Sequence, residues 1–355
     1  MISIFSRSNE WPSGQRRFSI ACLSSVFVAL LVVGCAKPQQ QIRFTGATMG
    51  TQYAITVVDD TNIVTETRLK HDIEALLAKI NQIMSNYDSN SEISRLNRHR
   101  STDWLAISDE LLELLTAANS VSQESNGAFD VTVAPLVDLW GFGPARGAGR
   151  IPDNDVIEVA RRRVGLRQFE LRASPPGLKK LHGEVAFDLS GIAKGYAVDE
   201  IAHQLRELGL VNFLVDIGGE MRAVGTNQRG EGWQIGIEGP IALGSTVAQT
   251  ITLHDSGLAS SGNYRNNFVV DGVQYGHTID PKTGLPTQHA LLAVSVVHAR
   301  AMLADAWATA LMSMGPDAAV NVLAKVGLAA MLFNKNGDSW QITTTPAFDE
   351  AVKQR

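Results

Sequence analysis

The sequence predicts an α+β fold, in which a mostly antiparallel sheet is flanked by helices. Short runs rich in β-branched residues recur along the second half of the chain, and short turn sequences join most of them. Short connections favour antiparallel pairing, because parallel strands need a long crossover. Helical segments lie among these runs without a strict strand–helix rhythm, so a doubly wound parallel sheet is not expected.

The first half of the chain is expected to contain a strand and two helices before a long irregular segment. Alternating β-branched residues predict the strand at 52–57. Apolar residues at helical spacing predict an amphipathic helix at 64–84. Ser108 is expected to cap a further helix, because acidic residues fill the turn that follows it. The segment 140–180, rich in Gly, Pro and Arg, is predicted to be a surface excursion.

The second half is expected to hold most of the sheet. Strands are predicted at 211–217, 233–238, 248–254, 266–270, 291–298 and 328–333. Helices are predicted at 191–208, 300–314 and 316–325. A single folded domain is therefore expected over residues 43–350.

The N-terminal segment is typical of a bacterial lipoprotein signal. Three arginines precede an apolar run at 18–33, about 16 residues, which is shorter than the roughly 20 that a membrane-spanning helix needs. The run ends in Val32-Val33-Gly34-Cys35, which resembles the lipobox at which such signals are cut. We expect a cleaved signal at 1–34 and a lipidated Cys35 at the start of a tether that reaches residue 42. The alternatives are an ordinary signal sequence and an uncleaved anchor.

Cysteine count and charge exclude several classes of function. The chain has two cysteines, and Cys22 lies inside the expected signal. The domain is therefore expected to contain no disulfide, thiolate metal site or cysteine nucleophile. The net charge is −5 and no basic run stands out after the signal, so a nucleic-acid surface is not expected.

Asp305 and Thr309 form the sharpest chemical motif. They stand four residues apart in a segment of small apolar residues, which places both side chains on one face of a buried helix. Carboxylate and hydroxyl oxygens are hard donors suited to Mg²⁺ or Ca²⁺. A buried Asp also needs a partner or an ion. The alternative is an Asp that caps a neighbouring loop, with Thr309 bonded to its own helix.

Two further motifs combine turn chemistry with reactive side chains. In the first, a strand ends at Asp188 and a helix begins after Ser190-Gly191, where exposed amides favour an anion such as phosphate. Lys194 adds a positive charge in the first turn, and simple capping by Ser190 is the alternative. In the second, His277 precedes an Asp-Pro-Lys-Thr-Gly turn, although a lone histidine is more often structural.

Two other signals are weak. Glycines near 141–147 suggest a dinucleotide fingerprint, but Pro144 and the lack of a preceding strand argue against it. The segment around Ser260 lacks the first glycine of a hydrolase elbow. A Rossmann domain and a serine hydrolase are therefore not expected.

Taken together, the chain resembles the FAD:protein FMN transferases, the ApbE family. The resemblance extends from about Gly46 to Gly315, and it rests on many short blocks in the same order. They are residues 48–51, 91–97, 127–132, 139–143, 188–199, 216–220, 261–265, 277–281 and 304–309. The family implies two related halves that share the sheet, with FAD bound between lobes.

The resemblance also implies which residues act. The positions that match flavin-contacting residues are Met49, Tyr87, Ala128, Phe129, Asp130, Asp188, Lys194 and Ile279. Asp305 and Thr309 match ligands of Mg²⁺, and the main-chain oxygen of Gly191 completes that site. Lys194 is where relatives vary, since some have an acidic residue there.

The implied reaction breaks the pyrophosphate of FAD. A Ser or Thr hydroxyl of an acceptor protein attacks the phosphorus of FMN, and AMP leaves. His277 is the candidate base, because its ordinary pKa suits proton transfer near neutral pH. Two alternatives stay open: a Mg²⁺-dependent FAD pyrophosphatase that uses water, and a non-catalytic flavin-binding lipoprotein.

The resemblance suggests membrane redox-pump subunits as acceptors. These are inner-membrane proteins, which favours a lipid-anchored enzyme on the periplasmic side of that membrane. Ala36 lacks the Asp that commonly retains lipoproteins there, which favours the outer membrane instead. The balance of the two arguments predicts the inner membrane.

Overall fold

The computed structural model describes residues 40–59, 64–144, 150–240, 247–263, 266–337 and 339–353. The predicted signal at 1–34 and Cys35 lie outside the described residues. Within them, no helix is both long and apolar enough to cross a membrane.

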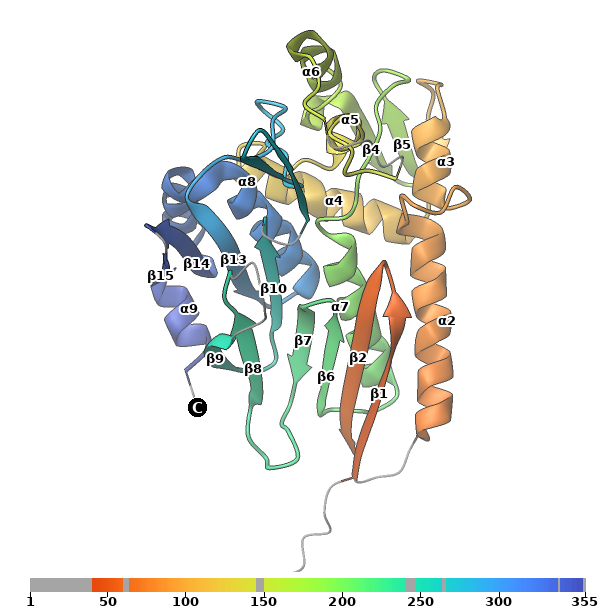
Figure 1. The fold of residues 1–355 in the computed structure, drawn as a ribbon. Helices are drawn as coiled ribbons and strands as arrows, with labels where there is room; N and C mark the ends of the chain where they lie inside the picture. The colour runs from red at the N-terminus through yellow and green to blue at the C-terminus, as the bar shows by residue number, and fades with distance from the viewer. Residues whose placement is uncertain are drawn as a thin grey trace, which may run out of the picture. The chain divides into compact units, whose positions relative to one another are not determined.

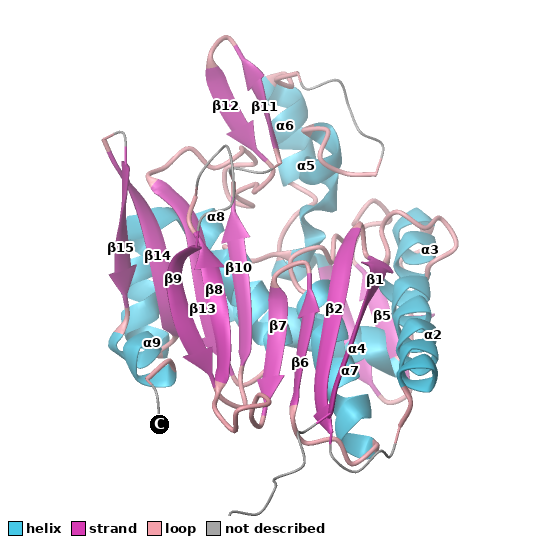
Figure 2. Cartoon of the chain, turned by 60° about the horizontal axis from the view of Figure 1, so that its bottom comes forward, coloured by secondary structure: helices cyan, strands magenta, loops and turns pink. Residues whose placement is uncertain are grey.

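A large antiparallel sheet organises the described chain (Figures 1 and 2). It contains eight strands, all paired with antiparallel neighbours. In spatial order they are β1 (Gln40–Thr48), β2 (Thr51–Asp59), β6 (Phe213–Ile217), β7 (Glu220–Val224), β10 (Gly257–Gly262), β13 (Leu291–His298), β14 (Ala329–Asn336) and β15 (Ser339–Thr344). The predicted α+β class and mostly antiparallel sheet are confirmed.

The sheet consists of two halves with the same order of elements. In the first half, strands β1 and β2 are followed by helices and then by the hairpin β6–β7. In the second half, β10 and β13 are followed by a long helix and then by the hairpin β14–β15. The halves join where β7 pairs with β10, through only two residue pairs.

Helices cover one face of the sheet and bury the main core. These are α2 (Glu66–Met84), α4 (Asp109–Glu124), α7 (Ala193–Glu207) and α8 (Ala301–Val326). Helix α8 bends at Gly315, whose φ of 76° is not helical, so the two predicted helices form two arms of one element. Ser108 caps α4 as predicted, since its hydroxyl accepts from the amide of Leu111 at 3.2 Å.

A second, smaller layer covers part of the opposite face. It is the hairpin of β8 (Trp233–Glu238) and β9 (Val247–Leu253), with α9 (Pro346–Ala351) beside it. Trp233, Ile235 and Ile237 alternate with exposed residues and pack on the sheet. This layer lies mainly over the second half of the sheet, so the outer face of β1, β2 and β6 remains more open.

The remaining elements are α3 (Glu92–Arg98), α5 (Ala134–Leu139), α6 (Asn154–Arg161), a three-stranded sheet of β3 (Leu105–Ala106), β5 (Pro176–Lys180) and β4 (Phe169–Ala173), and the hairpin of β11 (Asn267–Val270) and β12 (Val273–Gly276). Of these, α5, α6 and the hairpin β11–β12 lie above the sheet in Figure 2, and α3 and β5 lie beside its β1 end. The interpretation of 140–180 as a surface excursion is wrong for its second part. Phe169 and Leu178 belong to the main core, so hydrophobic burial fixes this hairpin despite its Gly and Pro content.

Candidate active site

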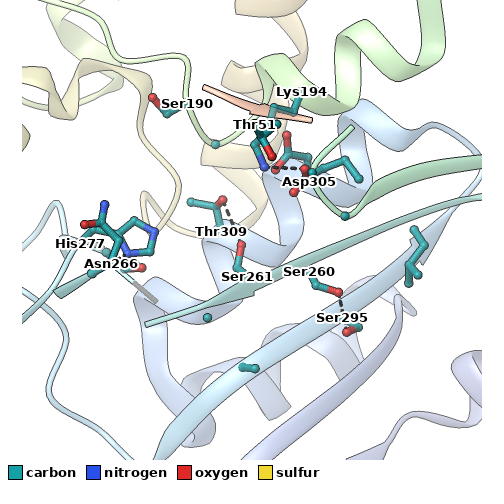
Figure 3. A pocket seen from close by; sticks show the side chains of 18 of the residues that line it. Thr51, Ser190, Lys194, Ser260, Ser261, Asn266, His277, Ser295, Asp305 and Thr309 are labelled. Atoms are coloured by element: carbon teal, nitrogen blue, oxygen red, sulfur yellow. Dashed lines mark hydrogen bonds and ion pairs between the residues drawn. The ribbon is translucent and has the colours of Figure 1, made fainter. Parts of the chain in front are cut away.

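A large cavity lies where the two halves of the sheet meet beneath the upper elements. Its volume is about 880 Å³, within the range of small-molecule sites. The lining includes Asp188, Gly191 and Lys194 before and within α7, Asp305 and Thr309 on α8, and His277 after β12. Residues from distant parts of the sequence therefore share one cavity, and Figure 3 shows several of them.

The loop before α7 is held by side chains from α3 and from the turn after α2. The main-chain oxygen of Phe187 accepts from the amides of Asn86 and Asn97, at 2.6 and 2.8 Å. Asn97 in turn accepts from the amide of Phe187 at 2.7 Å. These bonds fix the backbone just before Asp188 and thereby the position of that side chain. Sequence reasoning assigned no role to either asparagine.

The N-terminus of α7 lies at the cavity, since Gly191 and Lys194 belong to its lining. Ile192 stands at the cap position without a side-chain bond to the helix, so Ser190 is not the cap. The Ser190 amide instead donates to Asp188 at 2.8 Å. Two of the first amides of α7 are already bonded, because Ala193 donates to the main-chain oxygen of Leu189 at 2.9 Å and Gly195 donates to Asp305 at 3.0 Å. What this helix end offers a ligand in the cavity is therefore mainly the positive end of the helix dipole.

Asp305, Thr309 and Gly191 come together as the metal hypothesis requires. Asp305 is 3% exposed, and its Oδ2 accepts from the amide of Gly195 at 3.0 Å. A Cβ placed on Gly191 would lie 2.9 Å from the Thr309 hydroxyl, so that main chain lies against the hydroxyl. In the described chain no three His, Cys, Asp or Glu side chains gather as a metal site. The donors that are present are hard oxygens, which fit Mg²⁺ rather than zinc.

Burial raises the pKa of the Asp305 carboxyl, and Lys194 opposes that rise. A nearby cation stabilises the charged form of a buried carboxylate, so the surroundings of Asp305 suit a ligand of a metal ion. The Asp305 Oδ1 oxygen is left for such an ion, because the hydrogen bond from Gly195 uses Oδ2.

Lys194 forms an ion pair with a carboxylate that sequence reasoning missed. Its Nζ lies 2.5 Å from Oε2 of Glu220, which is only 2% exposed at the start of β7. Burial works against the charge of Lys194, yet the Glu220 and Asp305 carboxylates raise the pKa of the amine. Burial likewise raises the pKa of Glu220. Glu220 is the last residue of the block at 216–220, which was used for the family resemblance but was given no chemical role.

His277 lies on the side of the cavity formed by the β11–β12 hairpin. Its Nδ1 lies 3.2 Å from the main-chain oxygen of Asn266, which fixes the ring (Figure 3). Burial lowers the pKa of His277, with the Asn266 bond acting in the opposite direction. The ring is therefore neutral near pH 7, and its Nε2 can accept a proton when Nδ1 carries the hydrogen.

Most residues that match flavin-contacting positions line the cavity, and Met49 is the exception. The lining includes Tyr87, Ala128, Phe129, Asp130, Asp188, Lys194 and Ile279. Met49 instead occupies the β1–β2 turn with a positive φ of 49°, and its side chain packs against the core. Asp130 is held by Thr132, whose amide and hydroxyl donate at 2.8 and 2.6 Å.

Two hydroxyl residues beside Asp305 and Thr309 also escaped sequence reasoning. Ser261 Oγ lies 3.5 Å from Thr309 Oγ1, in β10. Ser313 stands four residues beyond Thr309, so Asp305, Thr309 and Ser313 form one polar stripe along α8. The spacing of Ser313 could have identified it, whereas the position of Ser261 depends on the sheet register.

Comparison with known proteins assigns the chain to a family. The model of the ApbE family matches residues 49–332. The FAD:protein FMN transferase of Vibrio cholerae is 37% identical over 90% of this chain and 95% of its own length, and that of Haemophilus influenzae is 36% identical over 95% and 99%. The structure titled flavin transferase ApbE from Vibrio cholerae matches with a TM-score of 0.82 at 35% identity, over 88% of this chain and 100% of its own. The chain belongs to the ApbE family.

Proposed function

We propose that this enzyme transfers FMN from FAD to a Ser or Thr hydroxyl of an acceptor protein and releases AMP. The observation that carries this proposal is the grouping of Asp305, Thr309 and Gly191 with Lys194 and His277 around one cavity. Membership of the ApbE family, whose relatives are named FAD:protein FMN transferase, supports the same reaction.

Each group has a distinct task in this reaction. The acceptor hydroxyl attacks the FMN phosphorus, the bond from that phosphorus to the AMP oxygen breaks, and AMP leaves as a monophosphate. His277 takes the proton of the attacking hydroxyl, for which its neutral form is suited. The dipole at the N-terminus of α7 and the Lys194 amine neutralise negative charge on the phosphates.

Asp305, Thr309 and the main-chain oxygen of Gly191 would hold Mg²⁺. When bound, that ion supplies Lewis-acid stabilisation of charge on the phosphoryl oxygens. Tyr87, Phe129 and Ile279 offer apolar surface to the flavin, and Ala128, Asp130 and Asp188 lie beside them. Met49 is proposed to act indirectly, through the shape of the β1–β2 turn, because it does not line the cavity.

The test is mass spectrometry of a candidate acceptor after incubation with the enzyme, FAD and Mg²⁺. Covalent FMN on a Ser or Thr, with one AMP released for each, is the expected result. Rapid AMP release without acceptor would identify an FAD pyrophosphatase instead. FAD binding without AMP release under any condition would identify a flavin carrier.

We also propose that the domain over 43–350 is tethered to a membrane by lipid on Cys35, after removal of residues 1–34. The lipobox-like sequence supports this anchor, and inner-membrane redox-pump subunits are the proposed acceptors. Cys35→Ser should release the enzyme from membranes into the periplasm. Membrane retention of that variant through an uncleaved N-terminus would contradict the proposal.

A further inference from the structure

The cavity has a second arm on the outer face of the sheet, away from the helices. Side chains alternate between the two faces of a strand. Ala54 and Asp216 are paired in neighbouring strands, and their parity matches that of Val58 and Leu214, which pack with the outer layer. We call this arm the outer-face groove; it is lined by Arg43, Thr45, Ala54, Asp216, Met221 and the segment 236–238.

The outer-face groove joins the helix side through a notch in the sheet. Strands β7 and β10 pair only at Gly257–Arg222 and Leu258–Met221; β7 begins at Glu220, one residue before Met221, so β10 continues past this point without β7 beside it. The β6–β7 turn beside the notch is Gly218-Gly219, with φ of 65° and 104°. A Cβ on Gly219 would meet no atom within 4 Å, whereas one on Gly218 would lie 2.7 Å from Thr51, so the open space is at Gly219. Both glycines line the same cavity as Asp305 and Thr309.

One wall of the groove is the open edge of a strand. Among the described residues β8 pairs only with β9, so its other edge has no neighbouring strand. Three successive β8 residues, Gly236, Ile237 and Glu238, line the cavity. Successive residues point to opposite faces, so a cavity that contacts all three follows the edge of the backbone. Such an edge is a template for an added strand.

No residue that matches a flavin-contacting position lines the outer-face groove, so the groove has no assigned ligand. These residues come from the β1–β2 turn (Met49), the turn after α2, the segment 128–130, the loop before α7, α7 itself and residue 279; none lies within β1, β6 or β8. The floor combines the apolar Ala54 and Met221 with the charged Arg43 and Asp216. This surface suits a polypeptide in extended conformation better than a second nucleotide, since a pyrophosphate would meet the Asp216 carboxylate.

We propose that an extended segment of the acceptor protein binds along β8 as a third strand of the outer layer. Its Ser or Thr side chain then points through the notch toward Thr309, so acceptor and FAD approach the reaction site from opposite faces of the sheet. The proposal rests on the transferase function and names the surface that selects its protein substrate. Main-chain bonds to β8 supply affinity, and the groove floor supplies selectivity.

Hydrogen exchange of the full chain tests the docking surface without catalysis. With FAD omitted, saturating acceptor protein should slow exchange of amides in 236–238 by about tenfold or more, while β15 at the far edge of the sheet is unchanged. Protection at β11–β12 in place of β8 would overturn the proposal. Slow exchange, before acceptor is added, of the amides in 236–238 that point away from β9 would also overturn it, because the edge would then already be occupied.

A matched pair of arginine substitutions tests the same surface by kinetics. Ala54→Arg fills the groove floor, whereas Thr343→Arg places the same side chain on the exposed edge strand β15. Ala54→Arg should raise the KM for acceptor protein about tenfold or more, a change of about 1.4 kcal/mol, with unchanged kcat and FAD affinity. Thr343→Arg should match the wild type.

The outcomes separate the docking proposal from the transferase function. Equal KM values in the two variants, or a parallel loss of FAD affinity in Ala54→Arg, would overturn the groove as acceptor site. If the wild-type enzyme releases AMP but transfers no FMN to any protein, the transferase function itself fails.

Discussion

Helices α7 and α8 cross near their N-termini, and each supplies a carboxylate to the other. Asp199 of α7 accepts from the first amides of α8, those of Ala301 and Met302, at 2.9 and 3.0 Å. Asp305 of α8 accepts from the amide of Gly195 in the first turn of α7, at 3.0 Å. The two exchanges look alike as hydrogen bonds, yet they occur in different surroundings.

The difference lies in what else each carboxylate meets. Asp199 uses both oxygens on α8 amides, away from the cavity lining, and acts as a cap supplied by a neighbouring helix. Asp305 uses one oxygen on Gly195 and lines the cavity with Thr309 beside it. Both carboxylates therefore bond the first turn of the other helix, but only Asp305 also faces the cavity, where it can serve the proposed ligand site.

Removal of the charge of Asp305 should have the largest effect on transfer. Asp305→Asn keeps an oxygen for the Gly195 amide but weakens the metal site, so we expect transfer to fall about 10³-fold or more. The variant should stay folded and melt at the same temperature or higher, because a buried charge without its ion is removed. Single-turnover transfer and thermal unfolding measure the two effects.

The matched control for this change is Asp317→Asn, which lies on the exposed surface of the same helix. It should leave both transfer and unfolding near wild type. Full activity of Asp305→Asn at limiting Mg²⁺ would remove Asp305 from the metal site and make the two helix ends equivalent.

His277→Ala should have the next largest effect. If the imidazole takes the proton of the acceptor hydroxyl, transfer should slow about 10² to 10⁴-fold while FAD binds nearly as before. His203→Ala, on the exposed face of α7, is the control. A joint loss of FAD affinity and rate would show that His277 shapes the flavin pocket, and Asp188 would become the next candidate base.

The pH dependence of transfer should follow the lowered pKa of His277. Burial favours the neutral ring, so the active form persists below the ordinary value of 6.5 and is lost as the pH falls through the lowered pKa. Below that pKa the rate should fall about tenfold per pH unit, and His277→Ala should lack this acidic limb. An identical limb in the variant would assign the titration to another group.

The fold was largely predictable because its signals are local. Helical spacing predicted α2 and the two arms of α8, and β-branched runs predicted β6, β8, β9 and β13 at nearly their observed bounds. Strands such as β7 and β10 were missed, since β7 is short with a single β-branched residue and β10 is rich in Gly and Ser, so both depend on neighbours for burial. The hairpin β4–β5 was missed for the same reason.

The site was predictable only where spacing or family resemblance carried it. Asp305 and Thr309 share a helix face, so their proximity follows from the sequence. Glu220 reaches Lys194 across the β6–β7 turn, and Asn86 and Asn97 reach Phe187 about 90 to 100 residues away. No local pattern reports such contacts, because they depend on how the sheet and helices are assembled.

Asp199→Ala should have the smallest effect on transfer, in contrast to the substitution of Asp305. Loss of the two bonds to α8 should lower the free energy of unfolding by about 0.5 to 2 kcal/mol, as for other helix caps. Ser108→Ala, which removes the cap of α4 from within its own segment, should cost a similar amount. Both variants should transfer FMN at the wild-type rate at 25 °C, because neither residue lines the cavity.

Asp199 bonds α8 at Ala301 and Met302, only one turn before Asp305. Its replacement is therefore a strict test of whether the two carboxylates act independently. If Asp199→Ala stays folded but transfers FMN about tenfold more slowly, the first turn of α8 positions Asp305. The carboxylates of α7 and α8 would then act as one coupled unit.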